Sequence, residues 1–346
     1  MKRPPNLIAV KLWMLATALG ACSACSFPSG RVTADVAKSL SMPREPSAQV
    51  TFKSADGATS LRGEITFPPG AGPFPAVVVM RARMCDGLAG IPEGWQQTTL
   101  NSWGYATLTI DNFAARNLTP AACSDFTVLE PSQTIGDAYG ALEVLASNPK
   151  IEARRIALLG FGGEGTTALL SDTIEARQHY KSSGGIGFRA FFAFYPYCNF
   201  EFVRPAVAYA PLRIFAGERD DISPAIRCVD LAKQLQEQGG DVAVIVYPGA
   251  EAGFDNPPPD ANLPNQDPLA LHPGSTTVSS HPQFSPWSEN LSACTFKVRS
   301  VFDVAKRSDV TGCLRRGVHF QGDATTADQA KSDLKAALDI LMRPQP

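Results

Sequence analysis

A glycine-rich segment is the first place where the order of residues suggests chemistry. Ile156 to Leu159 are apolar, Gly160 to Gly165 form a turn of sequence GFGGEG, and Thr166 to Leu170 continue as an apolar segment. A buried strand, a tight turn and a helix in this order can lift one side chain above a sheet. The same order can present a helix N-terminus to a phosphate. The segment is therefore a candidate for either a reactive residue or an anion site.

The phosphate interpretation depends on Gly160, Gly162 and Gly165, which satisfy the dinucleotide-binding pattern G-x-G-x-x-G. That pattern needs an acidic residue about 20 residues further on, at the end of the next strand, to hold a ribose. The next apolar run, Ala190 to Tyr195, is followed by Pro196 and has no acidic residue at its end. Nucleotide binding at this turn therefore stays an alternative to the main interpretation.

The composition is that of a globular protein. The chain has 346 residues, of which 44% are hydrophobic and 18% are charged, and this length suits one large α/β domain or two small ones. The net charge is -2, and no basic run is longer than a pair such as Arg315-Arg316, so we expect no nucleic-acid partner. We also expect no cofactor.

The N-terminus has the features of a bacterial export signal. Three positively charged residues, Lys2, Arg3 and Lys11, precede a short apolar run from Leu12 to Leu19. This run is too short to span a bilayer. Leu19-Gly20-Ala21-Cys22 resembles a lipobox, in which the cysteine carries lipid after cleavage. We therefore expect a signal peptide over residues 1–21, a lipid anchor on Cys22 and a tether over residues 22–47. The protein would face the periplasm on a membrane; plain secretion is the alternative.

Export would place the other cysteines in an oxidising compartment. Apart from Cys22 and the nearby Cys25, six cysteines remain, and an even number suggests three disulfides. Their order along the chain suggests the following pairs, one of about 15 pairings that six cysteines allow: Cys85–Cys123, Cys198–Cys228 and Cys294–Cys313. Metal binding is the competing interpretation, but the sequence has no C-x-x-C pair and only four histidines. We therefore expect no metal.

The elements that must position the glycine turn alternate between strands and helices, which predicts an α/β fold with a mostly parallel central sheet flanked by helices. Residues 49–53 and 61–67 predict an N-terminal hairpin. Further strands are expected at residues 76–80, 105–110, 156–159, 190–195, 212–216 and 243–247. Helices are expected at residues 95–103, 132–146, 166–170, 224–238 and 324–341. One domain would span residues 48–346, with a Pro-, Ser- and Asn-rich loop insertion at residues 256–293.

Over about residues 48–342 the chain resembles the dienelactone hydrolase family of α/β-hydrolases. These segments carry the resemblance: Trp103-Gly104-Tyr105 with Asp111-Asn112-Phe113 and Arg116, Asp137–Ala141, Tyr195–Cys198, Gly217–Pro224, and Tyr247–Asp255. The last two resemble the family's acid loop (Gly217–Pro224) and histidine loop (Tyr247–Asp255), and they are the most specific, because several residues match at fixed spacing. The resemblance implies an α/β-hydrolase fold and hydrolysis of carboxylic esters or lactones. The order of glycine turn, acid loop and histidine loop is also that of α/β-hydrolases.

The resemblance also implies where catalytic residues should stand. Acyl transfer in this fold needs a nucleophile, an imidazole base and an acid that orients the imidazole. Asp220 stands at the family's acid position, with Asp221 as a fallback, but the nucleophile position holds Gly162 and the histidine position holds Ala252. We therefore expect a catalytically impaired or inactive protein that acts in ligand binding or as a scaffold. An active hydrolase with relocated catalytic groups is the alternative.

Other residues could take over the roles of the nucleophile and the base. Glu164 occupies a family glycine position, and we expect it to be exposed at the helix N-terminus in a capping role. The remaining candidates are interpreted as ordinary helix residues (Thr166 and Thr167), loop histidines (His272 and His281) and surface histidines (His179 and His319).

The last expectation concerns two arginines. Arg81 and Arg83 follow the strand at residues 76–80, where the family usually has a His-Gly pair. Without a histidine donor, a buried Asp220 must be protonated, hydrated or paired. One arginine could pair with Asp220 or Glu164, and the other could hold a small carboxylate ligand in a fork-like pair. The alternative is that both arginines point to solvent.

Overall fold

The computed structural model describes residues 47–80, 95–118, 129, 131–180, 183–256, 284–290, 292–303, 312–313, 315–319 and 322–344. For residues 131, 284–290 and 316–318 only the backbone is described. All of these residues belong to one compact unit, Glu45–Pro346. The expected signal peptide, the lipidation site Cys22 and almost all of the tether lie outside the described residues.

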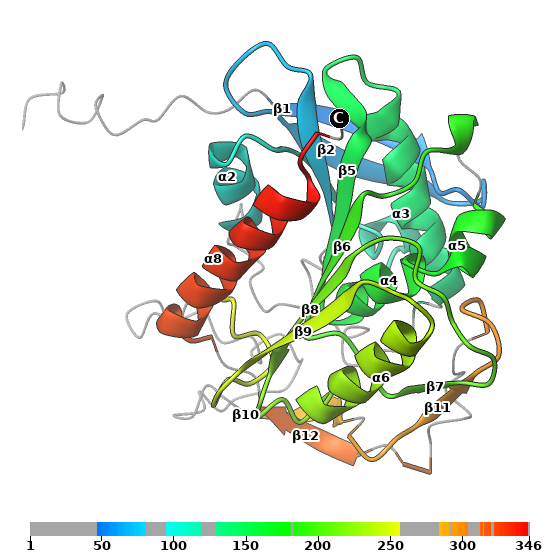
Figure 1. Cartoon of the computed structure of the whole chain (residues 1–346), viewed down its shortest axis with the longest axis vertical. Coiled ribbons are helices and arrows are strands. Elements are labelled where there is room, and N and C mark those ends of the chain that lie inside the picture. The colour runs from blue at the N-terminus through cyan, green and yellow to red at the C-terminus, as the bar shows by residue number, and fades with distance from the viewer. Residues whose placement is uncertain are drawn as a thin grey trace, which may run out of the picture. The chain divides into compact units, whose positions relative to one another are not determined.

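An eight-stranded sheet runs through this unit in the order β1-β2-β4-β3-β5-β6-β8-β9 (Figure 1). Its strands are β1 (Ser47–Lys53), β2 (Ser60–Thr66), β3 (Phe74–Met80), β4 (Ala106–Ile110), β5 (Ile151–Phe161), β6 (Ala190–Phe194), β8 (Leu212–Gly217) and β9 (Val242–Tyr247). The pairs β1–β2 and β2–β4 are antiparallel, and all other neighbours in this sheet are parallel. The predicted mostly parallel sheet and N-terminal hairpin are confirmed.

Helices cover both faces of the sheet (Figure 1). On one face lie α3 (Pro131–Ala146), α4 (Gly163–Ser171), α5 (Ile174–His179) and α6 (Ala225–Glu237), and on the other lie α2 (Trp95–Ser102) and α8 (Ala324–Leu341). The two faces have separate apolar cores. For example, Leu142 of α3 belongs to the first core and Leu334 of α8 belongs to the second.

The central strands explain why these helices pack where they do. All five residues of β6 are buried and apolar, AFFAF, as expected for a parallel strand that is covered on both faces. On α6 the buried residues Cys228, Leu231, Ala232 and Leu235 recur at three- and four-residue spacing, which gives one apolar stripe toward the sheet. Burial of these stripes fixes the layered arrangement.

Two small sheets were not predicted. β7 (Phe200–Phe202) pairs in parallel with β11 (Phe296–Val298), and β10 (Phe284–Asn290) pairs antiparallel with β12 (Arg315–His319). The expectation that residues 256–293 form only a loop is therefore wrong for its last part, where β10 lies. Strands of three residues leave no alternation to detect, and the polar β12 lacks the apolar character of a buried strand.

Two of the three predicted disulfides are confirmed. Cys198 bonds to Cys228, and a second disulfide joins Cys294 to Cys313. The third predicted pair, Cys85 with Cys123, lies outside the described residues. Disulfides are typical of oxidising compartments, so these two are consistent with export. None of the helices within the described ranges is long and apolar enough to cross a membrane.

Candidate functional site

A sharp backbone turn joins β5 to α4 at Gly162, and we call this turn the elbow. Gly162 has φ 58° and ψ -123°, a region that side-chain-bearing residues rarely occupy. Its N–H donates to the Phe194 carbonyl of β6 at 2.9 Å, and its own carbonyl accepts from the Thr166 N–H at 3.1 Å. Backbone groups of the neighbouring strand and helix therefore hold residue 162 at the carboxyl end of the sheet.

The elbow's glycines have a packing role. A Cβ atom added at Gly160 would lie 1.9 Å from the Glu164 carbonyl oxygen, and one added at Gly165 would lie 2.7 Å from the Phe194 carbonyl oxygen. Both positions must be glycine for α4 to pack this closely against β5 and β6. Close packing therefore accounts for the G-x-G-x-x-G spacing, and the ribose-binding acid that nucleotide binding requires is missing from the end of β6.

The nucleophile position has room for a side chain but carries none. A Cβ atom added at Gly162 would meet the Tyr195 ring at 3.7 and 3.9 Å, which are ordinary contact distances. Tyr195 itself has φ 37°, an uncommon value for a residue with a side chain. Its hydroxyl donates to Asp255 Oδ1 at 2.7 Å, while Trp95 Nε1 donates to Asp255 Oδ2 at 2.9 Å. Sequence analysis missed this cluster, because three separate segments form it.

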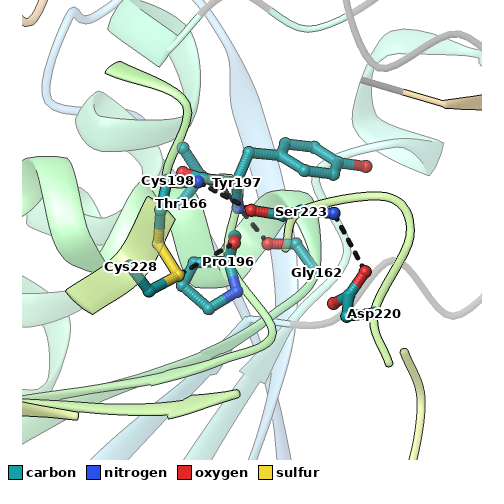
Figure 2. Close-up of a disulfide and its surroundings, with 8 residues drawn as sticks. All are labelled: Gly162, Thr166, Pro196, Tyr197, Cys198, Asp220, Ser223 and Cys228. Carbon is teal, nitrogen blue, oxygen red and sulfur yellow. Dashed lines mark hydrogen bonds between the residues drawn. A yellow bond between two sulfur atoms is a disulfide. The ribbon is translucent and has the colours of Figure 1, made fainter. Parts of the chain in front are cut away.

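The acid loop places Asp220 beside the elbow and ties it to the first disulfide (Figure 2). Ile222 and Ser223 each donate a backbone N–H to Asp220 Oδ1, at 2.8 and 2.9 Å. The Ser223 hydroxyl accepts from the Cys198 N–H at 3.0 Å, and Cys198 is disulfide-bonded to Cys228 of α6. Covalent and hydrogen bonds thus connect the end of β6, the acid loop and α6. Asp220, the expected triad acid, lies in the loop that these bonds hold in place.

Asp220 is deeply buried, with 4% of its surface exposed. Burial raises the pKa of Asp220 from 3.8 to about 7, because it disfavours the charged form more than the two N–H bonds stabilise it. The nearby carboxylates of Asp221 and Glu251 add to this increase in pKa. An isolated buried acid with this pKa is half-protonated near neutrality, unlike the ionised acid of a working triad.

The histidine position, Ala252, is 1% exposed and follows β9 in the loop that ends at Asp255. The described residues include two histidines, and neither makes a hydrogen bond to Asp220. His179 packs against Tyr180 and Phe302, with ring centroids 4.6 and 4.4 Å away. No imidazole from this part of the chain therefore bonds to Asp220.

His319 of β12 instead pairs with Asp221. His319 Nδ1 lies 2.7 Å from Asp221 Oδ2, and the His319 N–H donates to Oδ1 at 3.0 Å. A carboxylate can only accept, so Nδ1 is the donor when Asp221 is ionised. The surface location predicted for His319 is confirmed, since half of its side chain is exposed, but the pairing was missed. A separation of 98 residues leaves no local signal for it.

Glu164 is not exposed, and the prediction of an exposed capping residue is wrong. Only 3% of its surface is exposed, because its side chain turns toward the end of β4, where Asn112 donates to Oε1 at 2.7 Å. Burial raises the pKa of Glu164 to about 7, and the Asn112 bond opposes this increase in pKa. Thr166 and Thr167 lie in α4 as expected, and the Thr166 hydroxyl also accepts from the Tyr197 N–H at 2.7 Å.

Several predicted residues lie outside the described parts of the chain: Cys22, Arg81, Arg83, Cys85, Cys123, His272 and His281. The proposed pairing of an arginine with Asp220 or Glu164 is therefore untested. A search of the described residues finds no group of three or more side chains that could bind a metal ion.

Comparison with known proteins identifies the class to which this fold and elbow belong. The chain belongs to the dienelactone hydrolase family, whose model matches residues 61–270. No match is found among curated proteins.

Solved structures are similar to this chain at low sequence identity. A dienelactone hydrolase-like promiscuous phosphotriesterase from metagenomic libraries is 16% identical, over 86% of this chain and 99% of its own, with a TM-score of 0.51. A candidate dienelactone hydrolase from Klebsiella pneumoniae is 17% identical, over 61% of this chain and 89% of its own, with a TM-score of 0.48. A propionate-bound esterase from Thermogutta terrifontis is 17% identical, over 68% of this chain and 94% of its own, with a TM-score of 0.46.

Proposed function

We propose that this protein is a dienelactone-hydrolase-like protein that has lost triad catalysis and acts by binding a small molecule or as a scaffold. One observation carries the proposal: the elbow backbone is kept, but its apex is Gly162, which has no side chain to attack an acyl carbon. Ala252 at the histidine position supports it, because no base would activate a nucleophile there. Loss of either group alone lowers the rate by orders of magnitude, and the losses are not additive.

An esterase assay tests this proposal. The full chain should hydrolyse p-nitrophenyl acetate no faster than buffer does. Hydrolysis above buffer that Asp220→Ala abolishes and Asp328→Ala leaves unchanged would contradict it, since Asp328 is an exposed acid on α8. The double variant Gly162→Ser with Ala252→His should gain only a trace of activity, because the Arg81–Arg83 segment replaces the family's His-Gly pair.

A second candidate function is ester or lactone hydrolysis with relocated groups, and the Asp221–His319 pair favours it. With Nδ1 held by Asp221, His319 Nε2 could take a proton from water as the water oxygen attacks an ester carbonyl. The same proton would then go to the leaving alkoxide. This candidate predicts hydrolysis that His319→Gln removes and His179→Gln does not.

The location and the ligand are further parts of the proposal. The lipobox-like sequence supports a lipid on Cys22 and a location on the periplasmic side of a membrane, with plain secretion as the alternative. Mass spectrometry of the membrane fraction would detect the lipid, and an unmodified Cys22 there would contradict it. A carboxylate ligand is a separate proposal, which depends on Arg81 and Arg83.

A further inference from the structure

We infer that the vacated catalytic position beside Gly162 binds an organic cation of the arylalkylammonium type, with Asp220 and Glu251 as its carboxylate partners. This inference rests on the proposed binding function and names the chemistry of the ligand.

Asp220 has one carboxylate oxygen left for a ligand. Both hydrogen bonds that the described residues make to Asp220 go to Oδ1, from the N–H groups of Ile222 and Ser223. In an intact triad the acid stabilises the imidazolium that forms on the neighbouring histidine. Ala252 removes that cation, while Asp220 remains buried in its place in the acid loop. An ammonium group could supply the positive charge that the imidazolium would have supplied.

Glu251 brings a second carboxylate to the same place. It directly precedes Ala252, and its Oε2 atom is buried without a hydrogen-bond partner in the part of the chain that the structure describes. The loops that carry Asp220 and Glu251 are in contact, since the Arg219 N–H donates to the Ala250 carbonyl at 2.8 Å, and the charges of Glu251 and Asp221 both raise the pKa of Asp220. An ammonium group carries three N–H donors and can therefore serve more than one carboxylate.

Cations also lie near these acids. Arg219 and His319 act electrostatically on Glu251, and His319 is bound to Asp221. The charges with the largest effect on the pKa of Asp220 are those of the two acids Asp221 and Glu251, which raise it. A cation bound at this point would relieve the repulsion among these acids.

Two tyrosine rings lie beside the elbow. The place of a Cβ atom at Gly162 is 3.7 Å from the Tyr195 ring, and that at Gly163 is 3.7 Å from the Tyr197 ring. Figure 2 shows Asp220 at the end of the hydrogen bonds that lead from the disulfide through Ser223, with Gly162 drawn between Asp220 and the Tyr197 ring. Aromatic rings attract cations as well as apolar groups. An ammonium carried on an aryl group matches this combination of rings and carboxylates.

Isothermal titration calorimetry with three probes of similar shape tests the inference. Benzylammonium, benzyl alcohol and benzoate are titrated into the full chain at pH 8 and equal ionic strength. We expect benzylammonium to bind at least about tenfold more tightly than the other two, since one lost charge pair is commonly worth that factor. Binding should weaken about tenfold from pH 8 to pH 6, because a carboxyl with a pKa of about 7 is then mostly protonated.

Isosteric variants identify the partners. Asp220→Asn and Glu251→Gln should each weaken benzylammonium binding about tenfold, and Asp328→Asn on α8 should leave it unchanged. Tighter binding of benzoate would overturn the inference in favour of a carboxylate site, and equal binding of all three probes would reduce it to aromatic contact. No binding of benzylammonium also overturns it, even where the esterase assay stays negative. Hydrolysis that depends on Asp220 would overturn the proposed function instead.

Discussion

Replacing Asp220 with asparagine should stabilise the protein at neutral and alkaline pH. Asparagine keeps an Oδ1 atom to accept the N–H groups of Ile222 and Ser223, but carries no charge. Burial raises the pKa of Asp220 from 3.8 to about 7, so the folded state holds this proton more tightly than the unfolded state does. The stabilisation from protonated Asp220 is complete below pH 3.8 and is lost as the pH rises through about 7.

The size of the effect follows from the difference between the two pKa values. From 3.8 to about 7 is roughly three pH units, and each unit corresponds to about 1.4 kcal/mol in the free energy of unfolding. The wild-type protein should therefore lose about 4 kcal/mol from this group between pH 4 and pH 8. Asp220→Asn should match the wild type at pH 4 and exceed it by about 4 kcal/mol, or about 8 °C in Tm, at pH 8.

Thermal unfolding of both proteins from pH 4 to pH 8 measures this difference directly. Asp328→Asn is the control, because Asp328 lies on the exposed side of α8 and should show the same pH dependence as the wild type. Equal or lower stability of Asp220→Asn at pH 8 would refute the reasoning. It would mean that the folded protein supplies a cationic or hydrogen-bonding partner that compensates the charge of Asp220.

Three further predictions concern the same structure. Glu164→Gln should stabilise the protein by about 3 kcal/mol at pH 8 and not at pH 4, because burial raises the pKa of Glu164 from 4.5 to about 7; urea unfolding at both pH values measures this. Joint replacement of Cys198 and Cys228 with serine should cost about 3–4 kcal/mol in urea unfolding, given their separation of 30 residues, and no loss would contradict a structural role. Gly160→Ala should cost about 3 kcal/mol or more, since the Glu164 carbonyl occupies the place of its Cβ atom, whereas Gly312→Ala, with open space around it, should change Tm little.

The sequence was most informative where the chain is buried. Apolar runs such as residues 76–80 and 190–195 located the central strands within two residues of their observed bounds, because both faces of a parallel strand are covered. The disulfide Cys198–Cys228 could also be predicted, from the even number of cysteines and their order along the chain.

The polar contacts of the site could not be predicted in the same way. Glu164 was expected at the surface because it stands in the first turn of a helix, where a carboxylate is favourable. In the folded chain Asn112, 52 residues earlier, meets it at the end of another strand. His319 and Asp221 are in contact although 98 positions separate them in the sequence. Such pairs depend on the relative placement of whole elements, which a local pattern does not contain.

The way the site is held does not depend on side chains at positions 162 and 252. Gly162 is fixed through its own amide and carbonyl groups, and Asp220 is fixed through backbone N–H groups of its loop. The disulfide and Ser223 then connect the acid loop to the end of β6. None of these contacts uses a nucleophile or a catalytic imidazole. Substitutions at positions 162 and 252 can therefore remove triad chemistry while the elbow and the acid keep their places, and a buried acid kept in place is what a cationic ligand requires.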